Sequence, residues 1–143
     1  MAKPHFRAGV VTVVQRSDGK VLAFERTDRA DQWQLPQGGI ENGESPKQAA
    51  WRELSEETGL DKRHVRLLRE HEDWTVYTWP KEMRPDERLG QVHRWFFFEW
   101  KGLDIEPTPD GNEFGAWRWM NPKDLIEQVV EFRQGPYRQV LGG

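Results

Sequence analysis

The most constraining feature of the sequence is the stretch RELSEE at residues 52–57, which is expected to place several carboxylates on one helix. On a helix, Glu53 and Glu57 lie one turn apart on the same face, and Glu56 lies beside them. Because like charges at this spacing repel one another, the helix must present this face either to solvent or to a bound cation. Oxygen ligands grouped in this way suit Mg²⁺ or Mn²⁺. The alternative is a solvated acidic face balanced by Arg52, and the glutamates alone do not separate the two interpretations.

Local signals predict that this helix runs from Pro46 to Thr58. Ser45 is a favourable N-cap residue, and Gln48 stands where a capping box requires Glu or Gln. Proline also fits the first helical position. Gly59 is placed to end the helix, since glycine readily adopts the left-handed conformation of a C-terminal cap.

The rest of the chain predicts a sheet and a second helix. The segments that predict strands are residues 9–15, 20–27, 65–78 (one or two strands), 91–100 and 115–120. The first two are separated by a turn and predict a hairpin. Residues 80–90 predict a polar loop, and residues 123–132 predict the second helix after an Asn-Pro start signal. This order predicts a mixed α/β sandwich in one domain, residues 1–143.

Composition excludes several classes of function. A net charge of −3 argues against a general nucleic-acid coat or an anionic membrane partner, although it permits a local basic pocket. The absence of cysteine excludes a disulfide framework, a thiolate metal site and a cysteine nucleophile. The longest aromatic run, residues 95–98, is far too short to span a bilayer, and the first residues lack the apolar stretch of a signal peptide. We therefore expect a cytoplasmic protein with no DNA or membrane partner.

The spacing around the glutamates is more specific than the glutamates themselves. Nine positions in the 23-residue window 38–60 agree with a known pattern, namely Gly38, Glu44, Arg52, Glu53, Leu54, Glu56, Glu57, Gly59 and Leu60. In this window the chain resembles the Nudix hydrolases, and the match covers the Nudix box. The resemblance implies an α/β/α sandwich with a central mixed sheet, in which a loop, a helix and a second loop carry the metal site.

The resemblance also implies a role for each position of the box. The implied ligands of a divalent cation, Mg²⁺ with Mn²⁺ as a substitute, are Glu53, Glu56, Glu57 and the carbonyl group of Gly38. Glu44 and Arg52 are implied to form a structural ion pair that holds the loop on the helix, and Gly38 and Gly59 are further structural positions.

The reaction that the family performs is attack by water at a phosphorus of a nucleoside diphosphate linked to another group. Metal ions would neutralise developing charge and acidify the attacking water. A carboxylate that is not fully committed to metal would accept the proton. Glu56 and Glu113 are the two candidates, and the sequence does not separate them.

Segments outside the box resemble one branch of the family, the bacterial RNA 5′-pyrophosphohydrolases and the plant-type diadenosine tetraphosphate hydrolases. These segments are residues 33–40 (WQLPQGGI), 90–96 (GQVHRWF), 113–119 (EFGAWRW) and 132–138 (FRQGPYR). The third implies Glu113 as a fourth catalytic glutamate and metal ligand. The fourth implies that Phe132 stacks on a base and that Arg133 contacts phosphate or base. Packing of Phe132 in the core is the alternative.

Other expected substrate contacts come from the strands. They are Arg7, Arg26, Tyr77 and Arg94. For Tyr77, structural burial is the alternative. Arg7 resembles an N-terminal arginine that contacts phosphate in this branch, although its spacing to Gly9 is shorter than in some members. A second basic residue often follows Arg26 in the branch. Thr27 stands there in this chain, with Arg29 nearby as a substitute.

Three functions are compatible with these observations. The first is hydrolysis of a pyrophosphate bond in dinucleoside polyphosphates or in 5′-triphosphate RNA ends. The second is removal of free nucleotides or nucleotide sugars by a housecleaning enzyme. The third is a non-catalytic Nudix domain that senses a nucleotide, and the intact glutamates with Arg52 argue against it. A nucleotide polyphosphate, or the 5′ end of an RNA, is the expected partner, and the chain is expected to be a monomer or a homodimer.

Overall fold

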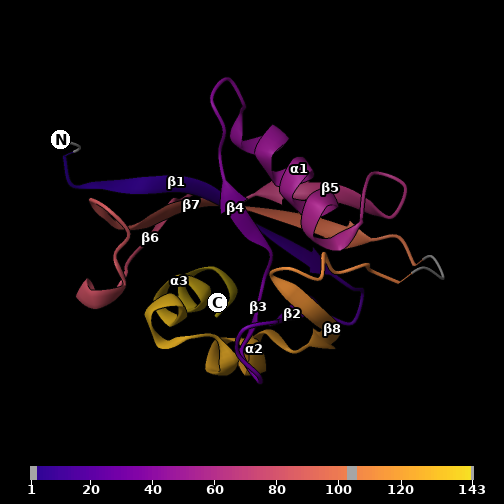
Figure 1. Ribbon diagram of the computed structural model, residues 1–143. Helices are drawn as coiled ribbons and strands as arrows, with labels where there is room; N and C mark the ends of the chain where they lie inside the picture. The colour runs from indigo at the N-terminus through magenta and orange to yellow at the C-terminus, as the bar shows by residue number, and fades with distance from the viewer. Residues whose placement is uncertain (1–2, 103–105, 143) are drawn as a thin grey trace.

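The computed structural model describes residues 3–102 and 106–142. Its mixed sheet lies between α1 on one side and α2 with α3 on the other, which confirms the expected α/β/α sandwich (Figure 1). The strands are β1 (His5–Gln15), β2 (Val21–Arg26), β3 (Trp33–Gln34), β4 (Gln37–Gly39), β5 (Val65–Glu70), β6 (Thr75–Thr78), β7 (Arg88–Trp100) and β8 (Phe114–Met120). The helices are α1 (Pro46–Thr58), α2 (Pro122–Gln128) and α3 (Glu131–Leu141), with a 3-10 turn, η1, at Lys81–Met83. Within the described ranges, no helix has an apolar run of the length that crossing a membrane requires.

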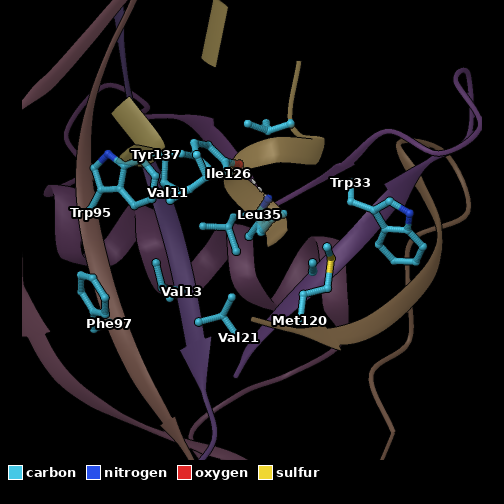
Figure 2. Packing of buried hydrophobic residues seen from close by; sticks show 13 residues of the cluster. Val11, Val13, Val21, Trp33, Leu35, Trp95, Phe97, Met120, Ile126 and Tyr137 are labelled. Atoms are coloured by element: carbon cyan, nitrogen blue, oxygen red, sulfur yellow. Dashed lines mark hydrogen bonds between the residues drawn. The ribbon is translucent and has the colours of Figure 1, made fainter. Parts of the chain in front are cut away.

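The valines of β1 build both halves of the core. Successive side chains of a strand point to opposite faces, so Val10 and Val14 pack under α1, whereas Val11 and Val13 pack under α2 and α3 (Figure 2). The helix residues that meet them are Ala49, Ala50 and Leu54 on the first face and Leu125, Ile126 and Tyr137 on the second. One apolar strand is therefore sandwiched between two helical layers.

The strand pairing explains where the sheet opens. β1 pairs in parallel with β7 along its whole length, beginning with His5 opposite Arg88, and β5 and β6 pair with the far edge of β7. The predicted hairpin forms only at its turn, where Gln15 faces Val21. Beyond this pair, β2 leaves β1 and pairs with β8 and β3. The edge of β1 that a hairpin would have used is taken by β4, which pairs with residues 9–11.

Local signals placed α1 correctly. The helix has the predicted bounds, and the Ser45 side chain and the Gln48 side chain each accept a hydrogen bond from the other's backbone N–H. Gly59 ends it with a φ of 73° in the left-handed region, and its N–H donates to the carbonyl of Ser55. The two ends of the helix are thus fixed by contacts that lie within a few residues in the sequence.

The prediction for the second helix was wrong in extent. Val129 and Val130 are extended, with ψ of 151° and 144°, so α2 ends at Gln128 and a separate helix, α3, follows. α3 was not predicted because Gly135 and Pro136 stand within it, and both residues are poor helix formers. Tertiary packing compensates: Tyr137 is buried, and its ring lies 5.2 Å from that of Trp95. Elsewhere, β7 begins three residues before the predicted Gln91, and η1 lies in the predicted polar loop.

The hydroxyl group of Tyr137 gives a direct test of how α3 is held. It accepts a hydrogen bond of 2.8 Å from the backbone N–H of Leu35, and both groups are buried. Tyr137→Phe would leave that N–H without a partner, so the free energy of unfolding should fall by about 1–3 kcal/mol. Denaturant unfolding measures the change. An unchanged midpoint with an unchanged slope would mean that this bond does not hold α3.

Candidate active site

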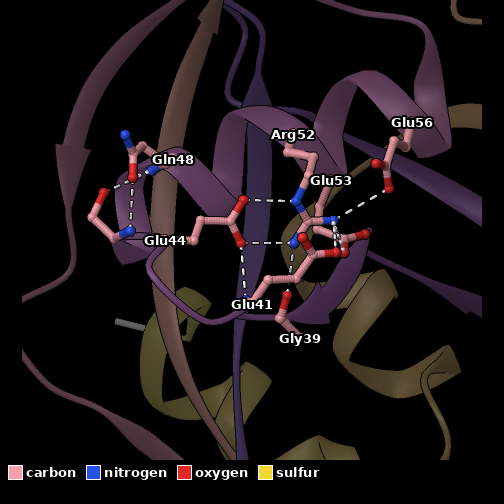
Figure 3. A network of polar contacts seen from close by, with 8 residues as sticks. Gly39, Glu41, Glu44, Gln48, Arg52, Glu53 and Glu56 are labelled. Atoms are coloured by element: carbon pink, nitrogen blue, oxygen red, sulfur yellow. Dashed lines mark hydrogen bonds and ion pairs between the residues drawn. The ribbon is translucent and has the colours of Figure 1, made fainter.

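Arg52 is the centre of the polar network on α1 (Figure 3). Its guanidinium donates two hydrogen bonds to the Glu44 carboxylate, at 2.7 and 2.9 Å, and one to the carbonyl of Gly39 at 2.9 Å. The Nη1 atom donates to Glu53 at 2.8 Å and to Glu56 at 3.3 Å. The Arg52 guanidinium holds the pKa of Glu44 at about 2, so this carboxylate is charged. The paired charges expected of Glu44 and Arg52 are therefore present, and they join the loop before α1 to the helix.

Glycines allow the loop to approach the helix and β1. A side chain on Gly38 would occupy the place that the Glu53 carboxylate fills, and one on Gly39 would overlap the Arg7 guanidinium. On the other side, the carbonyl oxygen of Gly38 lies 2.5 Å from the position that a Cβ of Gly9 would take. Glycine is needed at these positions because backbone and side chains meet here at close range.

Glu57 and Glu113 come together from distant parts of the chain. Glu57 lies in the last turn of α1 and Glu113 immediately precedes β8, where its carbonyl accepts from the N–H of Thr27. Burial, together with the charges of Glu113 and Glu53, raises the pKa of Glu57 well above its usual range. Burial also raises the pKa of Glu113. One oxygen of Glu57, Oε2, is buried without a hydrogen-bond partner among the described residues.

These carboxylates fit a hard divalent cation by their chemistry, although they do not form a closed cage. Among residues 3–102 and 106–142, no three histidine or acidic side chains are already arranged around one point as a metal-binding group. Glu53 and Glu57 are buried, whereas Glu56 is exposed and bonded to Arg52. Mg²⁺ keeps several water ligands and commonly takes only one or two protein carboxylates. The buried glutamates and the unpartnered oxygen of Glu57 are compatible with such a site.

Two arginines lie close to the segment that carries Glu113. Arg26 pairs with Phe114, the residue after Glu113, and the charges of Arg26 and Arg133 both act to lower the pKa of Glu113 against the larger effect of burial. The two guanidinium groups share the buried side-chain oxygen of Gln34, with Nη1 distances of 3.2 Å for Arg26 and 2.7 Å for Arg133. Arg26 is also bonded twice to Asp28, at 2.8 Å each. The sequence-predicted residues Arg26 and Arg133 are thus brought together with Glu113.

Tyr77 continues the same polar layer on the face of the sheet that α3 covers. It is buried, and its hydroxyl donates to the Gln91 side chain at 2.7 Å and accepts from Arg133 at 3.4 Å. The neighbouring His93 is buried, and burial with the charges of Arg133 and Arg7 lowers its pKa to about 3. The imidazole of His93 is therefore neutral, so it adds no charge beside the ring of Tyr77, which lies 5.7 Å away. Tyr77 is buried, as the alternative interpretation held, and it also contacts the basic group.

Phe132 lies on the wall of a pocket beside these arginines. Its ring is half-buried and lies 5.4 Å from that of Tyr77, with the Arg133 guanidinium 5.3 Å from its centroid. The pocket, of about 280 Å³, is lined by Arg26, Asp28, Arg29, Gln32, Trp79, Met83, Val130, Phe132 and Arg133. The aromatic wall and the basic side chains suit a nucleotide, with a base on the ring and phosphate near the guanidinium groups.

Arg94 is not brought into this group. Its guanidinium donates to Glu70 at 2.5 Å and lies over the ring of Trp74. The reason is alternation along β7: Gln91 and His93 point to the face that α3 covers, so Arg94 points to the opposite face.

Sequence reasoning did not identify Gln34, Gln91, Trp79 or Met83 as parts of this site. The glutamines are neutral and lie in apolar segments, so no charge pattern marks them. Residues 80–90 were predicted only as a polar loop. Trp79 borders this segment, and Met83 lies within it. The nearest signal was that residues 33–40 and 90–96 resemble a known branch of the family.

The comparisons with known proteins agree with this geometry. The NUDIX domain family matches residues 5–140. The RNA pyrophosphohydrolase of Bartonella tribocorum is 38% identical, over 95% of this chain and 88% of its own length. That of Rhodospirillum rubrum is 39% identical, over 95% and 85%. Nudix hydrolase 26, chloroplastic, of Arabidopsis thaliana is 34% identical, over 95% of this chain and 68% of its own length.

Solved structures show the same fold. The dihydroneopterin triphosphate pyrophosphohydrolase of E. coli superposes with a TM-score of 0.75 at 20% identity, over 95% of this chain and 97% of that one. A binary complex of the C. elegans Ap4A hydrolase superposes with a TM-score of 0.69 at 19% identity, over 93% of each chain. The family match along nearly all of the sequence, together with these relatives, shows that the chain belongs to the Nudix family and is a Nudix pyrophosphohydrolase.

Proposed function

We propose that this enzyme uses Mg²⁺ to hydrolyse a pyrophosphate bond in the 5′-triphosphate end of RNA. The observation that carries the proposal is the pair of arginines held together by Gln34, close to the segment of Glu113 and on the lining of a pocket with an aromatic wall. Relatives that are 38–39% identical over most of the chain are named RNA pyrophosphohydrolase, which favours an RNA end over other nucleotides.

In the proposed complex, the phosphates lie between the glutamates and the arginines. Glu53 and Glu57 would hold the cation. Further oxygen donors would come from Glu56, Glu113 and the Gly38 carbonyl. When bound, the cation neutralises phosphate charge and acidifies the attacking water. Arg26 and Arg133 bind the phosphate oxygens from the other side. The terminal base stacks on Phe132, since every base offers a π-face to an aromatic ring.

Of the two candidate proton acceptors, the geometry favours Glu113. Glu56 is exposed, and its carboxylate is already engaged by the Arg52 guanidinium at 3.3 Å. Glu113 lies beside Glu57, and burial raises the pKa of Glu113, which makes its carboxylate a stronger base. We propose that Glu113 takes the proton from the attacking water.

A dinucleoside polyphosphate is a second candidate substrate. A hollow of about 570 Å³ adjoins the first pocket. It is lined by Pro80 and Glu131, and by Arg29, Met83, Val130 and Phe132, which it shares with that pocket. Two adjacent hollows around one aromatic ring can receive two nucleosides. This feature is compatible both with a dinucleoside polyphosphate and with the first two nucleotides of an RNA.

A direct comparison of substrates tests the proposed function. A 5′-triphosphate RNA oligonucleotide, diadenosine tetraphosphate and free nucleoside triphosphates are offered with Mg²⁺, and kcat/KM is measured for each. We expect the RNA to give the highest value, because it can fill both hollows and extend beyond them. A preference for diadenosine tetraphosphate would select the second candidate, and a preference for free nucleotides would indicate a housecleaning enzyme.

Glu57→Gln tests the metal site. The change keeps the volume of the side chain but removes a charge, so kcat should fall by at least about 100-fold. Because burial raises the pKa of Glu57, its charged form destabilises the cation-free fold. The contribution of Glu57 to stability is fully present below its unfolded-state pKa and is lost as pH rises toward the folded-state value. The variant should lack this loss and melt at a higher temperature at neutral pH.

The stabilisation by cation gives a readout that does not depend on turnover. Mg²⁺ should raise the melting temperature of the wild type and raise that of Glu57→Gln much less. Glu127→Gln makes the same charge change at an exposed helical position and should behave as the wild type. Near-normal turnover of Glu57→Gln at saturating Mg²⁺ would show that Glu57 is not a metal ligand.

Phe132→Ala tests the position of the base. Binding of substrates that carry a base should weaken by about 1–3 kcal/mol, whereas a simple polyphosphate ester should bind nearly as before. Phe6→Ala, at a ring that is 39% exposed on β1, is the matched control. If Phe132 served only to pack the fold, truncation would cost up to about 3–5 kcal/mol of stability. All substrates would then be affected alike, and KM with melting temperature separates the two cases.

A further inference from the structure

Gln34 occupies an unusual position between the two arginines of the site. Its side chain is 1% exposed, and it comes from β3, the two-residue edge strand that pairs with β2. The Oε1 atom accepts from Nη1 of Arg133 at 2.7 Å and from Nη1 of Arg26 at 3.2 Å. One amide oxygen thus fixes two cationic groups that come from β2 and α3, segments that lie far apart in the sequence.

The two arginines differ in how their charge is balanced. Arg26 forms an ion pair with Asp28, at 2.8 Å, on the exposed side of the site. None of the ion pairs formed within residues 3–102 and 106–142 includes Arg133, although its side chain is buried. Its partners are the neutral side chains of Gln34 and Tyr77 and the faces of two aromatic rings. Burying an unpaired cation is costly unless another group compensates it.

Because the acceptor between the two arginines is a neutral amide, it cancels none of their positive charge, as a carboxylate would. Two guanidinium groups held side by side repel each other, and an anion that contacts both relieves the repulsion. A glutamate at this position would orient the arginines equally well and would also cancel part of their charge. An amide orients them and leaves the charge for a ligand.

We propose that Gln34 is a positioning residue that aligns Arg26 and Arg133 while leaving their charge available to the phosphates of the substrate. This inference rests on the proposed function, because it takes a polyphosphate as the ligand of the site. It adds to that function a reason why an amide, and not a carboxylate, stands between the arginines.

Gln34→Glu separates alignment from charge. The new carboxylate would form charge-assisted hydrogen bonds with both arginines, so the melting temperature should be maintained or should rise. KM for the cleaved substrate should increase about tenfold or more, with a smaller change in kcat. The dependence of KM on salt should become weaker, because fewer uncompensated cations contact the phosphates.

Gln128→Glu is the matched control. Gln128 also accepts a hydrogen bond from an arginine, Arg118, at 3.0 Å, but it lies on α2 outside the site. The same change in net charge at that position should leave KM and its salt dependence as in the wild type. Gln34→Leu tests the alignment of the arginines alone, because it removes the hydrogen-bond acceptor without adding charge. It should raise KM while the salt dependence stays close to that of the wild type.

A role in folding alone predicts a different pattern. In that case Gln34→Glu would leave KM unchanged, and Gln34→Leu would lower the melting temperature without affecting KM. Either result would overturn the proposal, as would a Gln34→Glu variant that fails to fold, because the proposal requires the carboxylate to preserve the arrangement.

Binding of inorganic tripolyphosphate, measured by calorimetry, distinguishes failure of this inference from failure of the proposed function. In one outcome, the wild type cleaves no triphosphate end but binds tripolyphosphate at least about tenfold more tightly than Gln34→Glu does. This result would contradict the proposed function and support the role of Gln34. In the other outcome, the wild type cleaves RNA ends, but both proteins bind tripolyphosphate equally well. This result would support the proposed function and overturn the role of Gln34.

Discussion

The site depends on a single guanidinium group. Glu53, Glu56 and Glu57 would repel one another on α1, and the loop before the helix has little apolar surface to hold it in place. Arg52 addresses both problems, because it bonds to Glu53 and Glu56 on its own helix and to Glu44 and Gly39 on the loop. Bidentate arginine–carboxylate pairs fix direction as well as distance. A lysine in place of Arg52 would retain the charge but could not make these bonds at once.

The second requirement is an opening in the sheet. If β2 had continued along β1, the hairpin would have closed the region where β4 now runs. β4 instead brings its glycines between β1 and the Glu53 carboxylate. β2 moves away with β8, and Glu113 immediately precedes β8. The carboxylates and the arginines therefore meet where β1 and β2 part.

Sequence patterns predicted those parts of the molecule that are determined locally. The bounds of α1 follow from Ser45, Gln48 and Gly59, which act within a few residues of the helix ends. The strand at residues 9–15 was likewise predicted from its own β-branched side chains, and it lies within β1. α3 could not be predicted in this way, because it contains Gly135 and Pro136 and is held by distant contacts such as that of Tyr137 with Leu35.

The same distinction applies to the site. The glutamates of α1 were recognisable from their spacing, but the buried bridge through Gln34 is visible only in three dimensions. Arg94 and Arg133 looked equivalent in the sequence because both are basic residues in segments that resemble the same branch. Strand alternation sets the direction of Arg94, and helix packing sets that of Arg133. As a result, only Arg133 lies beside Arg26.

The parallel pairing of β1 with β7 has a consequence for how the protein is made. β1 is synthesised well before its long partner β7, because α1, β5 and β6 lie between them in the sequence. During that interval a run of valines has no neighbour on one edge and incomplete helical cover on either face. Unpaired apolar strands are prone to associate with other chains. Newly made chains of this enzyme are therefore expected to need protection by chaperones until β7 emerges, and slow translation between the two strands would lengthen that period.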